Sequence, residues 1–315
     1  MNSAIHPLVS VPVITYNSSK TVVETLDSIY NQTYQNLELI VSDDCSTDNT
    51  VEICREWIAA HKERFVRTEL LTVEKNTGVS GNMNRAERAC QGEWIKVIAG
   101  DDLLMPKCVE TNVNYIKEHE DAIYVFSKVE VFGNSQNVVD GFVNEIFDYS
   151  FFDLSIENQY NWLIMRNFQP IPAATGFYNR NKLIELGIGY DERIPMLEDW
   201  PRWIRLLEKG IRFAFVDEVL VKYRVSENSI CSGEKYRDRF QKSIALLYIF
   251  YQHAPYIRRA GRFKGMYRYS FCKALLSGSW YWKLIYGGIR AVTVPKRIIK
   301  RIGEKLMFRK KSKNS

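Results

Sequence analysis

The sequence predicts an α/β protein built around a doubly wound sheet. Across the first 125 residues, short apolar runs alternate with amphipathic segments, which is the order of strands and crossover helices. Polar residues follow four consecutive apolar runs, and the carboxyl ends of such strands are where open α/β sheets bind ligands. A third observation, a change to a basic and aromatic pattern near the C-terminus, predicts a separate extension there.

The alternation defines the first elements in order. Strands are expected at 8–15, 37–42, 65–73 and 93–98, with helices at 21–31, 47–61 and 79–90. In the first helix, Thr21 and Glu24 have the spacing of a capping box. Its buried face is predicted to comprise Val22, Leu26, Ile29 and Thr33. Strand–helix alternation of this kind favours parallel strands joined by right-handed crossovers.

The middle of the chain mixes both element types without a linker. Strands are expected at 122–132 and 213–223, and helices at 182–186 and 200–209. Because no low-complexity segment separates this part from the first, one mixed α/β domain is the simpler interpretation. We therefore expect one domain over residues 1–230 and a helical extension over 231–315.

The charged residues are divided unevenly along the chain. From Pro255 onward, 17 Lys and Arg face one acid, Glu304, whereas the preceding 254 residues carry 26 basic and 36 acidic side chains. Segment 295–308 interleaves apolar and basic residues and follows an aromatic cluster at 280–286, a pattern typical of helices that bind anionic lipid surfaces. The alternative is that these helices pack on the preceding domain with solvated charges. No nucleic-acid-binding signature is present, so we expect no nucleic-acid partner.

The remaining composition indicates a reducing compartment. The six cysteines are scattered without a CxxC pair: Cys45, Cys54, Cys90, Cys108, Cys231 and Cys272. The start of the chain, Met1 to His6, is short and polar and does not resemble a secretory signal. No stretch reaches the roughly 20 apolar residues that span a bilayer. We expect a cytoplasmic protein held peripherally on the inner face of the cell membrane.

Four predicted strands end in polar residues. These ends are Thr15-Tyr16-Asn17, Asp43-Asp44, the segment 74–78 and Gly100-Asp101-Asp102. Neither a P-loop nor a GxGxxG follows the first strand, so phosphates need another binding mode. Adjacent carboxylates after an apolar strand favour a divalent cation that bridges to a diphosphate. The alternative is that Asp, Asn and Gly only end the strands and cap helices.

The order of several motifs carries a family resemblance. They are VPVITYN (11–17), IYNQTY (29–34), LELIVSDDCSTDNT (37–50), NTGVSGNMN (76–84), a strand running into GDD, LEDW (197–200) and YR (223–224). This ordered set resembles family 2 glycosyltransferases of the bacterial surface-polysaccharide type over about residues 8–230. The resemblance implies the GT-A fold, a Rossmann-like mixed sheet. It also implies a nucleotide-diphospho-sugar donor, a uridine nucleotide above others, and transfer with inversion in one displacement.

The resemblance also implies roles for individual residues. The implied nucleotide-binding set is Thr15, Tyr16, Asn17, Asp43, Asp44, Asn76, Asn84, Asp101 and Arg224. Asp101, helped by Asp102, would hold Mn²⁺ or Mg²⁺. Asp199 would be the catalytic base, with Glu198 contacting acceptor or donor sugar. On the residues alone, Asp199 could instead cap a helix that begins at Trp200.

Three positions depart from the family pattern. Ala99 replaces the first Asp of DxD, Met83 replaces a frequent Arg, and Ser226 replaces a frequent His. The expected function is inverting sugar transfer to a glycan or lipid-linked acceptor hydroxyl in bacterial polysaccharide (O-antigen or capsule) synthesis. Two alternatives stay open: a metal-dependent nucleotidyltransferase, and a non-catalytic binding protein on a degenerate transferase fold.

Overall fold

The computed structural model describes residues 6–133, 148–165, 173–194 and 197–225. The predicted boundary at residue 230, the basic extension and Ser226 lie outside these ranges. Within them, no helix is long and apolar enough to cross a bilayer.

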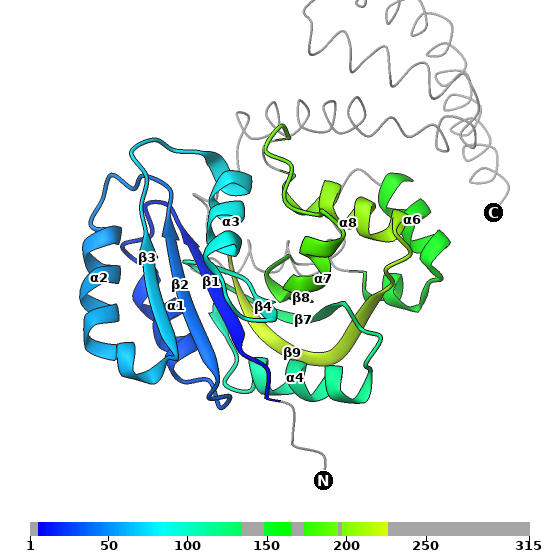
Figure 1. Ribbon diagram of the computed structural model, residues 1–315, viewed down its shortest axis with the longest axis horizontal. Coiled ribbons are helices and arrows are strands. Elements are labelled where there is room, and N and C mark those ends of the chain that lie inside the picture. Colours follow the sequence, from blue (N-terminus) through cyan, green and yellow to red (C-terminus); the bar gives the residue numbers. More distant parts are fainter. Residues whose placement is uncertain (1–5, 134–147, 166–172, 195–196, 226–315) are drawn as a thin grey trace, which may run out of the picture. The chain divides into compact units, whose positions relative to one another are not determined.

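The first half of the sheet is parallel, as predicted. Strands β1 (Val9–Thr15), β2 (Leu37–Asp43) and β3 (Arg67–Leu71) are joined through α1 (Val22–Tyr30) and α2 (Thr50–His61). Helix α3 (Gly78–Ala89) then leads to β4 (Trp94–Lys96) and β5 (Ile98–Ala99), which both pair with β1 (Figure 1). The strands β1 and β2 are almost entirely buried, as expected of a sheet covered by helices on both faces.

The second half makes the sheet mixed. The strand order is β3-β2-β1-β4-β8-β7-β9-β6, and β8 (Phe177–Asn179) runs antiparallel to both β4 and β7. The other strands are β6 (Leu103–Leu104), β7 (Tyr124–Gly133) and β9 (Phe213–Val225). The helices are α4 (Cys108–Glu118), α6 (Ile156–Met165), α7 (Arg180–Glu185) and α8 (Asp199–Glu208), and the short 3-10 helices are η1 (Lys62–Arg64), η2 (Tyr149–Asp153) and η3 (Ala173–Thr175).

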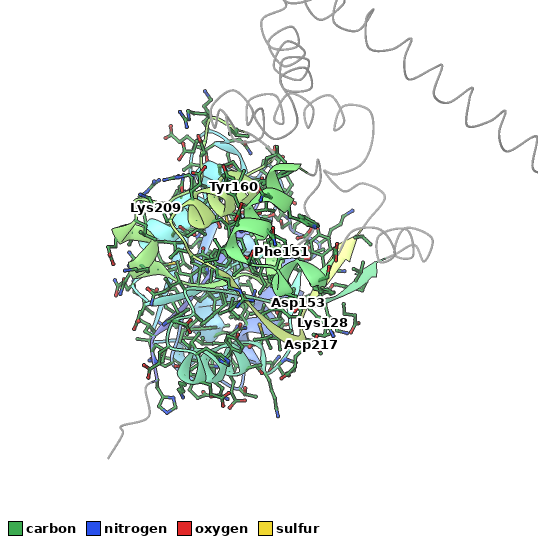
Figure 2. All side chains as sticks on the ribbon, turned by 90° about the vertical axis from the view of Figure 1, so that its right-hand side faces the viewer. Lys128, Phe151, Asp153, Tyr160, Lys209 and Asp217 are labelled. Carbon is green, nitrogen blue, oxygen red and sulfur yellow. The ribbon has the colours of Figure 1, made fainter. Side chains whose placement is uncertain are left out.

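The long pair β7 and β9 carries an irregularity that bends it. Its register shifts on both sides of Lys128, which is the behaviour of a β-bulge. The ammonium of Lys128 lies 2.5 Å from the carboxylate of Asp217 on β9, and Figure 2 shows the two side chains next to each other. Aromatic side chains fill the space between these strands, η2 and α8: Phe126, Phe151, Phe152, Trp203 and Phe213. This packing fixes the half of the sheet that supports α8.

Two expectations for α1 are wrong. The Thr21 side chain makes no capping bond to the helix, and its hydroxyl instead donates to the carbonyl of Gly100 at 2.7 Å. Glu24 accepts from Arg224 at 2.7 Å instead of reaching back to its own helix. The exposed Thr33 does not belong to the buried face, whereas the other predicted members of that face are buried. The start of α1 is thus used to hold the chain around Gly100 and Arg224.

Candidate active site

The ends of β1 and β5 lie side by side. Ile14 pairs with Ala99, so the residues after them, Tyr16 and Asp101, leave neighbouring strands at the same edge of the sheet. Gly100 is required there because an added Cβ would lie 2.9 Å from a methyl carbon of Thr15. The Tyr16 side chain is 47% exposed, which leaves its ring available for stacking on a base. The two exposed groups therefore sit at one place, as the sequence predicted.

The loop after Tyr16 is held by the loop after β2. Asn17 adopts a positive φ of 52°, and its side-chain oxygen accepts from the backbone N–H of Thr47 at 2.8 Å. Asp43 is buried and accepts from the hydroxyls of Thr15 at 2.8 Å and Ser46 at 2.5 Å. These bonds order the wall beside Tyr16 before any ligand arrives.

Asp44 ties β2 to the start of α3. Its buried carboxylate accepts from the backbone N–H groups of Thr77 at 3.0 Å and Gly78 at 2.8 Å, which favours a negative charge at a helix N-terminus. Arg85 also donates to this carboxylate, at 3.2 Å. The exposed Asn76 donates to the carbonyl of Asp44 at 3.0 Å. The capping role that residues alone left open is therefore real for Asp44, and its contact with a base stays a prediction.

Asp101 and Asp102 differ in their surroundings. Asp101 is an exposed residue, whereas Asp102 is 2% exposed and accepts from the backbone N–H of Arg224 at 2.8 Å. Although the residue is partly open to solvent, the protein atoms packed around its carboxyl raise the pKa of Asp101, and the Arg224 guanidinium opposes that rise. Burial and then the neighbouring Asp101 raise the pKa of Asp102 well above its usual range. The pair therefore offers one open carboxylate backed by a buried one.

This arrangement fits a divalent cation that shares its ligands with a substrate. No group of three or more His, Cys, Asp or Glu side chains among the described residues forms a complete protein cage for a metal. Mg²⁺ and Mn²⁺ commonly bind through one or two carboxylates and take their remaining ligands from phosphates and water. The exposed Asp101, beside Tyr16, meets that requirement, with the buried Asp102 behind it.

Arg224 holds the Asp101–Asp102 turn in place. Its Nε donates to the carbonyl of Asp101 at 2.8 Å, and the guanidinium lies 4.4 Å above the ring of Phe132. From the other side, the hydroxyl of Thr25 donates to the carbonyl of Asp102 at 2.8 Å. In the structure Arg224 thus positions the turn, and its predicted contact with the nucleotide remains open.

Glu198 and Asp199 stand at the start of α8. The helix begins at Asp199, so this residue lies in the first turn and does not cap a helix beginning at Trp200, as the alternative required. Asp199 is 6% exposed, and burial raises the pKa of Glu198. A carboxylate in the first turn is favoured by the helix dipole. The position is compatible with accepting a proton there.

Asn84 and Met83 face other parts of the protein. The Asn84 amide pairs in both directions with the backbone of Tyr190, at 3.0 and 2.9 Å, and donates to Glu192 at 2.8 Å. Met83, which stands where the family often has Arg, is buried in the core. The structure thus directs Asn84 to the segment before α8, and its contact with a nucleotide stays a prediction.

Sequence reasoning missed three basic residues that shape the site, of which two are fully buried. Arg85 reaches Asp44, and Lys96 is fully buried with its ammonium donating to the carbonyl of Ala174. Arg202, also fully buried, pairs with Glu87. A basic residue within an apolar strand, as in Lys96, and one three positions after Asp199 are signals that could have pointed to them.

The comparisons with known proteins agree with the observed fold. The sequence model described as "Glycosyl transferase family 2" matches residues 10–168. One relative, 24% identical over 76% of this chain and 85% of its own, is the UDP-Glc:alpha-D-GlcNAc-diphosphoundecaprenol beta-1,3-glucosyltransferase WfaP of Escherichia coli.

Two solved structures resemble the chain in fold. S. aureus TarS in complex with UDP-GlcNAc is 17% identical, with a TM-score of 0.58, over 85% of this chain and 81% of that one. The mannosyltransferase PcManGT of Pyrobaculum calidifontis, in complex with GDP-Man and Mn²⁺, is 19% identical, with a TM-score of 0.57, over 96% and 86%. The expected GT-A fold is confirmed.

Proposed function

Because the chain belongs to glycosyl transferase family 2, we propose that it transfers a sugar from a UDP-sugar to a hydroxyl of a glycan or lipid-linked acceptor. The observation that carries this proposal is the adjacency of the exposed Tyr16 and Asp101 at the ends of paired strands. Tyr16 stacks on the base and Asp101 meets the diphosphate. A UDP-sugar donor is supported by the TarS complex and by the name of the E. coli relative.

A divalent cation, Mn²⁺ or Mg²⁺, belongs to the proposed site. Asp101 is its direct ligand. Asp102 helps by fixing the turn that carries both residues, because its carboxylate accepts from the backbone N–H of Arg224. When bound, the cation offsets the charge that develops on the departing nucleoside diphosphate. The Mn²⁺ in the mannosyltransferase complex supports this assignment.

Asp199 is the proposed base. It accepts the proton of the acceptor hydroxyl as that oxygen attacks the anomeric carbon, and the bond to the diphosphate breaks in the same step. One displacement inverts the anomeric centre without an enzyme nucleophile. Glu198, the neighbour of Asp199 at the start of α8, contacts the acceptor or donor sugar in this proposal.

The cellular setting follows from the acceptor and the C-terminal charge. We place the protein at the inner face of the cell membrane, in surface-polysaccharide synthesis, where lipid-linked acceptors reside. The relative's diphosphoundecaprenol acceptor supports this setting. The 17 basic residues from Pro255 onward provide the contact with anionic lipid.

Release of nucleoside diphosphate from a panel of nucleotide-sugars, with and without Mn²⁺ or Mg²⁺, tests the proposal. We expect release from a UDP-sugar that the metal stimulates and that Asp101→Ala abolishes. No release from any donor, together with no binding of UDP by calorimetry, would support the non-catalytic alternative. Consumption of a nucleoside triphosphate and a sugar phosphate would instead identify a nucleotidyltransferase.

A further inference from the structure

A buried ion pair joins the helix that starts with Asp199 to α3. Arg202 is fully buried, and its two terminal nitrogens donate to the two carboxylate oxygens of Glu87 at 2.7 and 3.3 Å. Its guanidinium carbon lies 4.4 Å from the ring centre of Tyr178 and 4.2 Å from that of Tyr190. The Tyr178 hydroxyl also donates to Glu87. Arg202 is therefore held from several directions at once.

This ion pair contributes little net stability to the packing of α3 against α8. Desolvation of two charges offsets much of their attraction, so an apolar pair of similar size is often at least as stable. The remaining donor of Arg202, its Nε, is buried and finds no acceptor among the described residues. Stability alone thus gives little reason for charges here, whereas a bidentate contact fixes distance and orientation more sharply than apolar packing does.

The position of the pair explains what it orients. Arg202 follows Asp199 by three residues on α8, so the two lie one turn apart on the same side of the helix. The other end of α3 belongs to the donor site, because its first residues bind the carboxylate of Asp44. Figure 1 shows α3 between the strands of that site and α8.

A second contact also links α3 to the segment before α8. One turn before Glu87, the amide of Asn84 pairs with the backbone of Tyr190, in the segment that leads into α8. Helix α3 thus contacts the donor strands with its first turn and the base-bearing segment with its later ones. The proposed donor site and the segment that carries Asp199 are therefore both anchored to the same helix, α3.

We propose that Glu87 and Arg202 are positioning residues that hold Asp199 in register with the bound donor. The inference rests on the proposed function, in which Asp199 is the base. A base displaced by about 1 Å can cost on the order of a hundredfold in rate without any change in donor binding. Loss of the pair should therefore lower kcat and leave the Kd for UDP unchanged.

Four variants test the proposal. Glu87→Gln removes one charge, Arg202→Lys keeps the cation, and the double change Glu87→Leu with Arg202→Leu restores apolar packing. The matched control is Glu38→Gln, which breaks the ion pair between the buried Glu38 on β2 and the partly exposed Arg67 on β3, away from α8. For each, Tm, the Kd for UDP with Mn²⁺, and kcat for UDP release are measured.

We expect Glu87→Gln to lower kcat at least about tenfold, with the Kd for UDP within about twofold of wild type. Arg202→Lys should keep a higher kcat than the double leucine variant. The double leucine variant should nevertheless have a higher Tm than Glu87→Gln. The control should lose Tm but keep kcat. A double leucine variant with wild-type kcat would overturn the positioning role of Glu87 and Arg202 and leave the proposed function standing. An equal loss of kcat in Glu38→Gln would have the same meaning. A wild-type protein that releases no UDP would overturn the proposed function first.

Discussion

Burial of the Glu198 carboxyl lowers the stability of the folded protein when that carboxyl is ionised. Burial raises its pKa above the ordinary value of 4.5, so the unfolded chain ionises this carboxyl more readily than the folded protein does. The penalty is absent below the unfolded pKa and grows as pH rises above it. Glu198→Gln should therefore raise Tm at about pH 8 and leave it nearly unchanged at about pH 4.

Thermal unfolding at both pH values checks this prediction. Glu56→Gln, at an exposed position of α2, serves as the control and should change Tm at neither pH. An equal gain from Glu198→Gln at both pH values would show that burial of the charge is not the cause.

At the residue scale, the sequence indicated which residues lie at the candidate site better than it indicated their hydrogen-bond and ion-pair partners. Tyr16 and Asp101 follow recognisable strand ends, and the register of β1 and β5 places them together. The bonds of Asp44 to Thr77 and Gly78 connect positions 33 and 34 residues apart, which no local pattern reports. A longer separation, of 115 residues, concealed the pairing of Glu87 with Arg202.

At the element scale, the start of α1 acts as a support for the proposed metal turn. The buried hydroxyl of Thr25 donates to the carbonyl of Asp102, and valine there would keep the shape but leave that carbonyl without its donor. Thr25→Val should destabilise the protein by about 1–3 kcal/mol and weaken Mn²⁺-dependent binding of UDP several-fold.

Denaturant unfolding and calorimetry measure the two effects. Thr33→Val, at an exposed position just beyond the same helix, should change stability by less than about 0.5 kcal/mol and leave UDP binding intact. If Thr25→Val lowers stability while UDP binding remains at the wild-type level, the turn does not depend on α1.

The first elements of the sheet were predicted better than the rest, and the helices α4 and α6 were not predicted at all. The strands β1 and β2 are continuous apolar runs and the helices α1 to α3 follow amphipathic segments, and all five lie within a few residues of their predicted bounds. Strands β6 and β8, of two and three residues, are too short to produce a pattern. The antiparallel direction of β8 depends on its partners β4 and β7, so it could not be predicted locally.

At the scale of the whole molecule, the uneven charge predicts two separable activities. Each basic residue near an anionic surface contributes about 1 kcal/mol of binding, so loss of four should weaken vesicle binding by at least about a hundredfold. The four changes in the extension are Lys296→Gln, Arg297→Gln, Lys300→Gln and Arg301→Gln. UDP release in solution should be unchanged.

Co-sedimentation with vesicles of anionic lipid measures this effect. A control removes the same number of charges from exposed positions of the described domain, through Arg55→Gln, Lys62→Gln, Arg88→Gln and Lys209→Gln. Equal weakening in both variants would mean that net charge, and not the extension, drives binding.

The rate of UDP release by Asp199→Asn, beside the wild type, tests the central claim most directly. Asparagine keeps the shape of the side chain but cannot accept the proton, so the rate should fall about 10²–10⁴-fold. The Kd for UDP should stay within about twofold, because Asp199 acts on the acceptor and not on the nucleotide. An Asp199→Asn protein that releases UDP at the wild-type rate would contradict the assignment of Asp199 as the base.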